Sequence, residues 1–95
     1  MVTLAEDLRE KVEDVMRRRG VTRASVFGSV ARGDATPASD VDFLVEFEKG
    51  RTLLDLSGLR LDLRDELGRD VDVATPNSLH PDMKDQILSE LVRIL

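Results

Sequence analysis

Aspartates that interrupt strand-like segments are the feature that most constrains this chain. The segment Val41–Phe47 reads VDFLVEF, and Asp40 stands directly before it. A later strand-like run, Arg69–Ala74, places Asp72 between two valines. Carboxylates inside a strand are unfavourable unless water or a positive charge stabilises them. The pattern therefore predicts strands with one apolar face and one acidic face, and the acidic face requires solvent or a cationic ligand.

The rest of the chain predicts helices that alternate with these strands. Apolar residues at helical spacing, capping residues and turn residues set the boundaries. The expected elements are a helix capped by Thr3 and ended by Gly20, a strand Thr22–Phe27, a short helix Ser29–Arg32, the strand Val41–Phe47, a helix from Thr52 to about Leu67, the strand Arg69–Ala74 and a helix Asp82–Leu95. This order predicts an α/β (α+β) domain with a short mixed sheet and helices packed on it.

Length and composition limit the classes of protein that are possible. At 95 residues we expect a single domain, residues 1–95, with a modest core. No apolar run approaches the roughly 20 residues of a membrane helix, and no signal peptide is evident, so we expect a cytoplasmic protein. The absence of Cys excludes disulfides and thiolate metal sites. A net charge of −5 argues against direct binding to nucleic acid.

The two aspartates of the D-x-D sequence suit a metal site. Asp40 and Asp42 point to the same side of a strand, about 6.6 to 6.8 Å apart along it. Their carboxylates can share one ion or bracket two, and nucleotidyl transfer commonly uses two metal ions. Asp72, from a neighbouring strand, would complete a set of ligands suited to Mg²⁺. The alternative is an ordinary solvated acidic face, to which Asp70 would also belong.

A Gly-Ser pair that follows the first predicted strand is a candidate phosphate site. Gly28 lacks a Cβ, so a ligand can approach its backbone, and the Ser29 hydroxyl can donate to a phosphate oxygen. If a helix begins there, its free N–H groups favour an anion. The alternative is a plain turn. His80, the single histidine, lies beside Pro81, and we interpret it as a structural residue of a loop.

The order of these motifs resembles the minimal nucleotidyltransferase domain of the polymerase-β-like superfamily. The resemblance rests on Gly28-Ser29, Ala31-Arg32-Gly33 and Ser39-Asp40-Val41-Asp42. Within that group the chain is most similar to the MntA-type antitoxins of HEPN/MNT toxin–antitoxin pairs. The resemblance implies that Gly28 and Ser29 hold a triphosphate and that Asp40, Asp42 and Asp72 ligate Mg²⁺. Arg32 would contact phosphate, and its alternative role is that of a surface ion-pair partner.

The same resemblance implies a reaction and a partner. AMP would pass from ATP to a hydroxyl, which in this family is a tyrosine of the partner HEPN ribonuclease. Because this chain contains no Tyr, it cannot modify itself on tyrosine. Leucines within Leu53–Leu67 and the apolar last helix are candidates for docking that partner in a hetero-oligomer, with core packing as the alternative. A binding module that neutralises its partner by occlusion, and a nucleotidyltransferase acting on small molecules, remain alternative functions.

Overall fold

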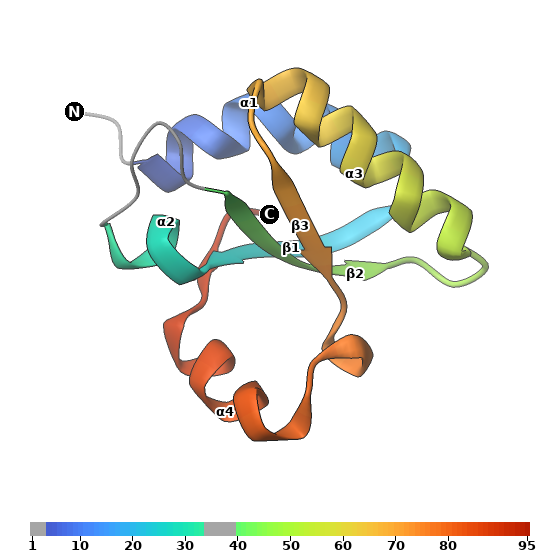
Figure 1. Ribbon diagram of the computed structural model, residues 1–95. Helices are drawn as coiled ribbons and strands as arrows, with labels where there is room; N and C mark the ends of the chain where they lie inside the picture. The colour runs from blue at the N-terminus through green and yellow to red at the C-terminus, as the bar shows by residue number, and fades with distance from the viewer. Residues whose placement is uncertain (1–3, 34–39) are drawn as a thin grey trace.

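The computed structural model describes residues 4–33 and 40–95, and its helices and strands follow the predicted order as far as α4 (Figure 1). The elements are α1 (Leu4–Arg18), β1 (Val21–Phe27), α2 (Gly28–Arg32), β2 (Val41–Phe47), α3 (Leu53–Leu67), β3 (Val71–Ala74), the 3-10 helix η1 (Pro76–Ser78), α4 (Pro81–Glu90) and β4 (Val92–Arg93). The predicted cap Thr3 and the turn-rich residues 34–39 lie outside the described residues. None of the helices in the described part of the chain is long and apolar enough to span a membrane.

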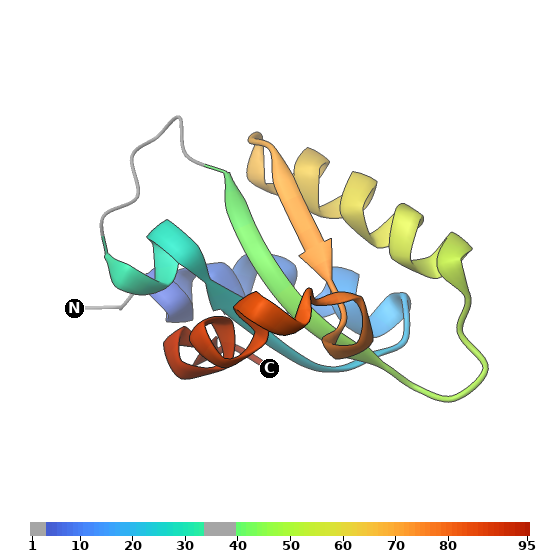
Figure 2. The same cartoon turned by 60° about the horizontal axis from the view of Figure 1, so that its bottom comes forward.

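The four strands form one mixed sheet in the order β3-β2-β1-β4. β1 runs antiparallel to both β2 and β4, whereas β2 and β3 are parallel. Helices α1 and α3 lie together on one side of the sheet, and α4 lies on the other side (Figures 1 and 2). This arrangement confirms the predicted α+β fold.

The apolar face of the sheet forms the core with α1 and α3. Val26, Phe43 and Val45 from the sheet are buried together with Met16 and Leu63 from the helices. The predicted alternation of β2 is thus confirmed, because its odd-numbered residues line the core. Burial of a side chain of this size stabilises a fold by roughly 1.5–3 kcal/mol, so this layer anchors the strands that carry the acidic residues on the opposite face.

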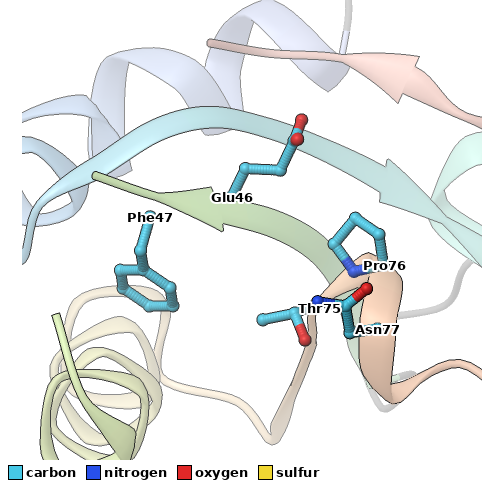
Figure 3. Close-up of a pocket in the computed structure, with 5 residues that line it drawn as sticks. All are labelled: Glu46, Phe47, Thr75, Pro76 and Asn77. Atoms are coloured by element: carbon cyan, nitrogen blue, oxygen red, sulfur yellow. The ribbon is translucent and has the colours of Figure 1, made fainter. Parts of the chain in front are cut away.

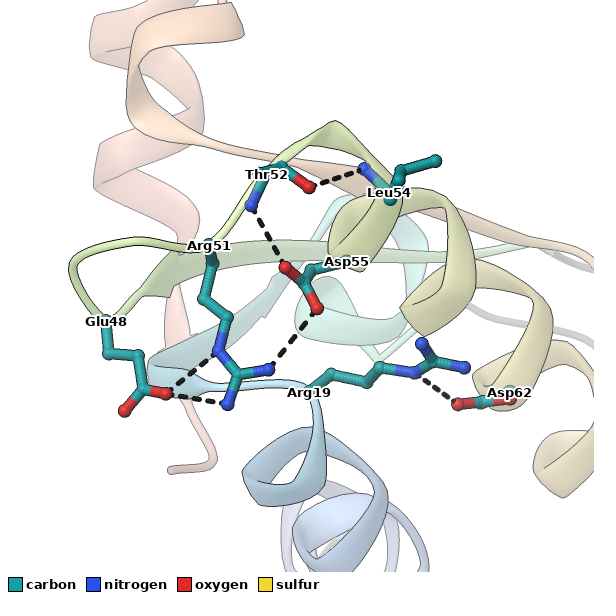
Figure 4. A network of polar contacts seen from close by, with 7 residues as sticks. All are labelled: Arg19, Glu48, Arg51, Thr52, Leu54, Asp55 and Asp62. Carbon is teal, nitrogen blue, oxygen red and sulfur yellow. Dashed lines mark hydrogen bonds and ion pairs between the residues drawn. The ribbon is translucent and has the colours of Figure 1, made fainter.

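Polar contacts fix the start of α3 and tie it to the end of α1 (Figure 4). The Leu54 backbone N–H donates to Thr52 Oγ1 over 3.2 Å, and the Thr52 backbone N–H donates to Asp55 over 3.0 Å, which completes a capping box. Arg19 donates to Asp62 over 2.8 Å, and this bond holds the pKa of Asp62 below its usual range. The cap predicted at Thr52 is therefore confirmed.

The predicted end of the last helix was wrong. The last helix ends at Glu90 instead of reaching Leu95, because Val92 pairs with Val26 of β1 and Ile94 donates its N–H to the Ala24 carbonyl. Pairing covers an edge of β1 that would otherwise leave backbone groups unsatisfied, so tertiary contact overrides the helical spacing. In α3, Leu59 and Leu63 pack in the core, whereas Leu53 is 78% exposed.

Candidate functional site

The turn after β1 lies directly against the D-x-D sequence. Phe27, the last residue of β1, is the antiparallel partner of Asp42 in β2. Gly28 follows with φ +71°, and a Cβ added there would lie 2.5 Å from Asp42 Oδ2. A residue with a side chain would therefore be strained in its backbone, and the Asp42 carboxylate would have to shift to admit it. The fold thus brings the Gly-Ser pair and Asp42 together.

Asp42 and Asp72 are registered partners of the parallel strands β2 and β3. Registered partners leave the same face of a sheet, which here is the face opposite the core residue Phe43. Asp40 directly precedes β2 and is exposed. Asp70 lies before the start of β3, and its backbone carbonyl accepts a hydrogen bond from the Val41 N–H over 3.1 Å. Asp72 is therefore the β3 carboxylate that stands beside Asp42.

The carboxylates of the site repel one another. Burial is the largest cause that raises the pKa of Asp42, and the nearby charges of Asp72 and Asp40 raise it further. Arg32 is the nearby cation that acts in the opposite direction. The negative charges at Asp42 are therefore not fully balanced by Arg32, and a bound cation would stabilise the ionised carboxylates.

The helix α2 carries the remaining predicted site residues. No side chain caps its start at Phe27, Ser29 is half-buried, and Gly33 ends the helix in the left-handed conformation. Arg32 is exposed, and its Nη1 forms an ion pair with Glu90 Oε2 over 3.4 Å. Arg32 thus has the ion-pair role considered in the sequence analysis, while it also lies near Asp42. Sequence reasoning missed Glu90, because it stands 58 residues from Arg32 and no local pattern joins the two.

The donor set suits a hard divalent cation, although its side chains are not gathered around one point. Among residues 4–33 and 40–95, no three His, Cys, Asp or Glu side chains lie close enough to hold a metal ion as they stand. Carboxylate oxygens are nevertheless the ligands that Mg²⁺ prefers, and the mutual repulsion at Asp42 is of the kind that a cation relieves. The residues therefore fit Mg²⁺ by their chemistry and their shared face.

A separate pocket of about 350 Å³ lies at the other end of β2 and β3 (Figure 3). It is lined by Glu46, Phe47, Thr75, Pro76 and Asn77. Along β2, Leu44 stands between Asp42 and Glu46 on the same face and is buried. The pocket is therefore set apart from the aspartates.

His80 has a structural role, as predicted. It precedes α4, and its Nδ1 accepts a hydrogen bond from the Asp82 backbone N–H over 3.2 Å. The imidazole thus caps the start of the helix, and it does so at an exposed position.

Known proteins share both the sequence and the fold of this chain. The nucleotidyltransferase domain family matches residues 8–94. The relative "Putative protein adenylyltransferase MJ0435" of Methanocaldococcus jannaschii is 47% identical over 89 residues, which are 94% of this chain and 96% of the relative. "Protein adenylyltransferase MntA" of Thermococcus cleftensis is 38% identical over 82 residues, which are 86% and 83% of the two chains.

Two solved structures extend the comparison. One, described as "Structure of putative minimal nucleotidyltransferase", has a TM-score of 0.77 at 48% identity and covers 88% of this chain and 86% of its own. Another, described as "Crystal structure of the toxin-antitoxin with AMP-PNP", also has a TM-score of 0.77, at 20% identity, and covers 92% and 72%. The second likeness concerns the fold. The family match and the two sequence relatives make this chain a minimal member of the nucleotidyltransferase domain family, and hence an enzyme of the nucleotidyltransferase class.

Proposed function

We propose that this protein is a Mg²⁺-dependent adenylyltransferase that transfers AMP from ATP to a tyrosine hydroxyl of a HEPN-family toxin and thereby acts as its antitoxin. The observation that carries the proposal is the contact between Gly28 and Asp42, with Asp72 as the registered neighbour of Asp42. A backbone able to approach phosphate and a set of carboxylates that needs a cation lie side by side. A metal-bound nucleoside triphosphate satisfies both.

Asp40, Asp42 and Asp72 would hold two Mg²⁺ ions. When bound, these ions supply positive charge that stabilises the pentavalent arrangement at the α-phosphorus and the departing pyrophosphate. Asp42 and Asp72 belong to adjacent, registered strands that the core anchors, so the backbone positions that carry the two carboxylates are set before the substrate arrives. Such preorganisation lowers the cost of reaching the transition state.

The triphosphate would lie against the start of α2. Backbone N–H groups at Gly28 and Ser29 and the Ser29 hydroxyl would donate to phosphate oxygens, and Arg32 would add positive charge from the same short helix. The acceptor oxygen attacks the α-phosphorus, the bond to the bridging oxygen of pyrophosphate breaks, and Asp72 takes the hydroxyl proton. The acceptor must approach in line with the leaving group, which requires that it be docked precisely enough to exclude other geometries.

The acceptor belongs to another protein. This chain has no Tyr. The relatives named as protein adenylyltransferases and the toxin–antitoxin structure with AMP-PNP support a protein acceptor, an ATP-like substrate and a hetero-oligomer with the toxin. The use of ATP as the donor is consistent with a location of this protein in the cytoplasm.

The test is adenylylation of a HEPN-family toxin by this protein in the presence of Mg²⁺ and ATP. We expect its intact mass to increase by AMP units, with the label mapped to tyrosine. Asp42→Asn should abolish the increase while leaving the complex with the toxin intact. If this variant still suppresses the toxin and the wild type leaves no adduct, the protein acts by occlusion. If small hydroxyl compounds are labelled and the toxin is not, the acceptor class is wrong.

A further inference from the structure

The ion pair between Arg32 and Glu90 joins two parts of the chain that lie 58 residues apart. Arg32 is the last residue of α2, and Glu90 is the last residue of α4. The two helices pack against each other. Arg32 Nη1 lies 3.4 Å from Glu90 Oε2, and the Glu90 side chain is the less exposed of the two, at 24% against 48%. The carboxylate therefore has the more restricted position and serves as the fixed partner.

Glu90 is tied to the strand that ends at the phosphate turn. Directly after Glu90 and Leu91, β4 pairs with β1 through Val92 and Arg93. The same β1 continues into Gly28. The backbone at Glu90 is thus held by the strand that positions the Gly-Ser pair, so movement of one relative to the other is restricted.

Arg32 lies one helical turn after the Gly-Ser pair. It is four residues after Gly28 and three after Ser29, a spacing that places residues on the same face of a helix. Side chains on a helix lean towards its N-terminus, which in α2 is the end that carries the Gly-Ser pair. The effect of Arg32 on the Asp42 carboxylate, which touches Gly28, is consistent with this placement.

We propose that Glu90 is a positioning residue that holds the Arg32 guanidinium beside the Gly28–Ser29 turn in the orientation that receives the triphosphate of ATP. A guanidinium is a rigid plane of N–H donors, so an ion pair between Nη1 and Glu90 restricts the direction in which that plane points. The inference rests on the proposed function, since it assumes that ATP binds at this turn. It adds a residue from the C-terminal part of the chain to the nucleotide site.

The test is a double-mutant cycle read out as the Kd of Mg²⁺–ATP on the full chain. Exposed ion pairs contribute up to about 1 kcal/mol, which corresponds to about a fivefold change in Kd. Glu90→Gln, which keeps the size of the side chain, should raise the Kd about three- to fivefold. Arg32→Ala should raise it about tenfold or more, and Glu90→Gln should add nothing in the Arg32→Ala background.

Two control variants separate positioning from general stability. Glu13→Gln removes the partner of Arg17 on α1, an ion pair of 2.9 Å, and should leave the Kd unchanged. The exchanged pair Arg32→Glu with Glu90→Arg preserves one ion pair between the helices, and its urea midpoint should match that of the wild type while its affinity for Mg²⁺–ATP is lost.

The outcomes distinguish the inference from the function on which it rests. Wild type that binds no Mg²⁺–ATP overturns the proposed function and the inference with it. If the wild type binds Mg²⁺–ATP and Glu90→Gln leaves the Kd unchanged or lowers it, the inference alone is overturned. An effect of Glu90→Gln that persists in the Arg32→Ala background also overturns it, because Glu90 would then act independently of Arg32.

Discussion

The Oδ2 atom of Asp42 lies 2.5 Å from the position that a Cβ atom on Gly28 would occupy. Real Cβ atoms do not approach an oxygen so closely, so the carboxylate occupies the space that the missing side chain leaves. This contact links the Gly-Ser turn to the D-x-D sequence across the β1–β2 pair. Its consequences can be measured, because the chain contains a glycine of similar backbone conformation elsewhere.

Gly28→Ala should abolish adenylyl transfer and destabilise the protein more than Gly33→Ala does. Both glycines have positive φ, +71° and +81°, so each alanine carries a backbone cost of about 1–2 kcal/mol. Among residues 4–33 and 40–95, nothing lies within 4 Å of a Cβ added at Gly33, whereas a Cβ added at Gly28 meets the Asp42 carboxylate. Urea denaturation and Mg²⁺–ATP binding measure the difference. Equal losses in the two variants would contradict a role for the contact.

Asp72→Asn should reduce transfer at least 100-fold, and Asp70→Asn should change it little. Asp72 is the registered neighbour of Asp42, whereas Asp70 precedes β3 and contributes its backbone carbonyl to Val41. Each tenfold change in rate corresponds to about 1.36 kcal/mol of activation free energy, so the loss of a metal contact worth several kcal/mol accounts for a roughly 100-fold slower transfer. Steady-state kinetics on purified variants measures it. A larger loss for Asp70→Asn would show that Asp70, and not Asp72, is the third carboxylate of the site.

Asp42→Asn should stabilise the metal-free protein at pH 7 while it abolishes transfer. The folded environment raises the pKa of Asp42, so ionisation of this group at neutral pH costs folding free energy. An uncharged amide of the same shape avoids that cost. Thermal unfolding in EDTA should therefore show a higher Tm for the variant, and added Mg²⁺ should raise the Tm of the wild type only. A lower Tm for Asp42→Asn in EDTA would contradict the repulsion described for this site.

Asp62→Asn should remove part of the acid sensitivity of the protein. Arg19 lowers the pKa of Asp62, so the ion pair contributes stability above the ordinary value of 3.8 and loses it as the pH falls through the lowered pKa. Urea midpoints measured from pH 7 down to pH 2 should fall less steeply for the variant. Glu66→Gln, at an exposed position of the same helix, is the matched control and should follow the wild-type curve.

Leu59→Ala should destabilise the fold by about 2–5 kcal/mol, whereas Leu61→Ala should change the stability by less than about 0.5 kcal/mol. Leu59 is fully buried against the sheet, and Leu61 is 58% exposed on the outer side of the same helix α3. Urea denaturation of the two variants tests this assignment. A loss above 1 kcal/mol for Leu61→Ala would contradict this assignment of the buried and exposed sides of α3.

The sequence by itself determined the strands β1, β2 and β3, the two ends of α3 and the residue types of the site. The alternation in Val41–Phe47 predicted which face of β2 is apolar, because side chains of a strand alternate whatever the strand packs against. Thr52 and Gly68 predicted the ends of α3, since capping is a local interaction between residues a few positions apart. The order of Gly28-Ser29 and Asp40-Val41-Asp42 predicted the family in the same way.

The tertiary structure decided what depends on contacts between distant segments. It ended α4 at Glu90 and paired Val92 with Val26, because the edge of β1 needs hydrogen-bond partners that a local pattern does not reveal. It aligned Asp72 rather than Asp70 with Asp42, since the register of two parallel strands is set by the whole sheet. It also brought Glu90 to Arg32. Spacing along the chain carries no information about such a pair, because the meeting of two side chains in space depends on how every element between them packs.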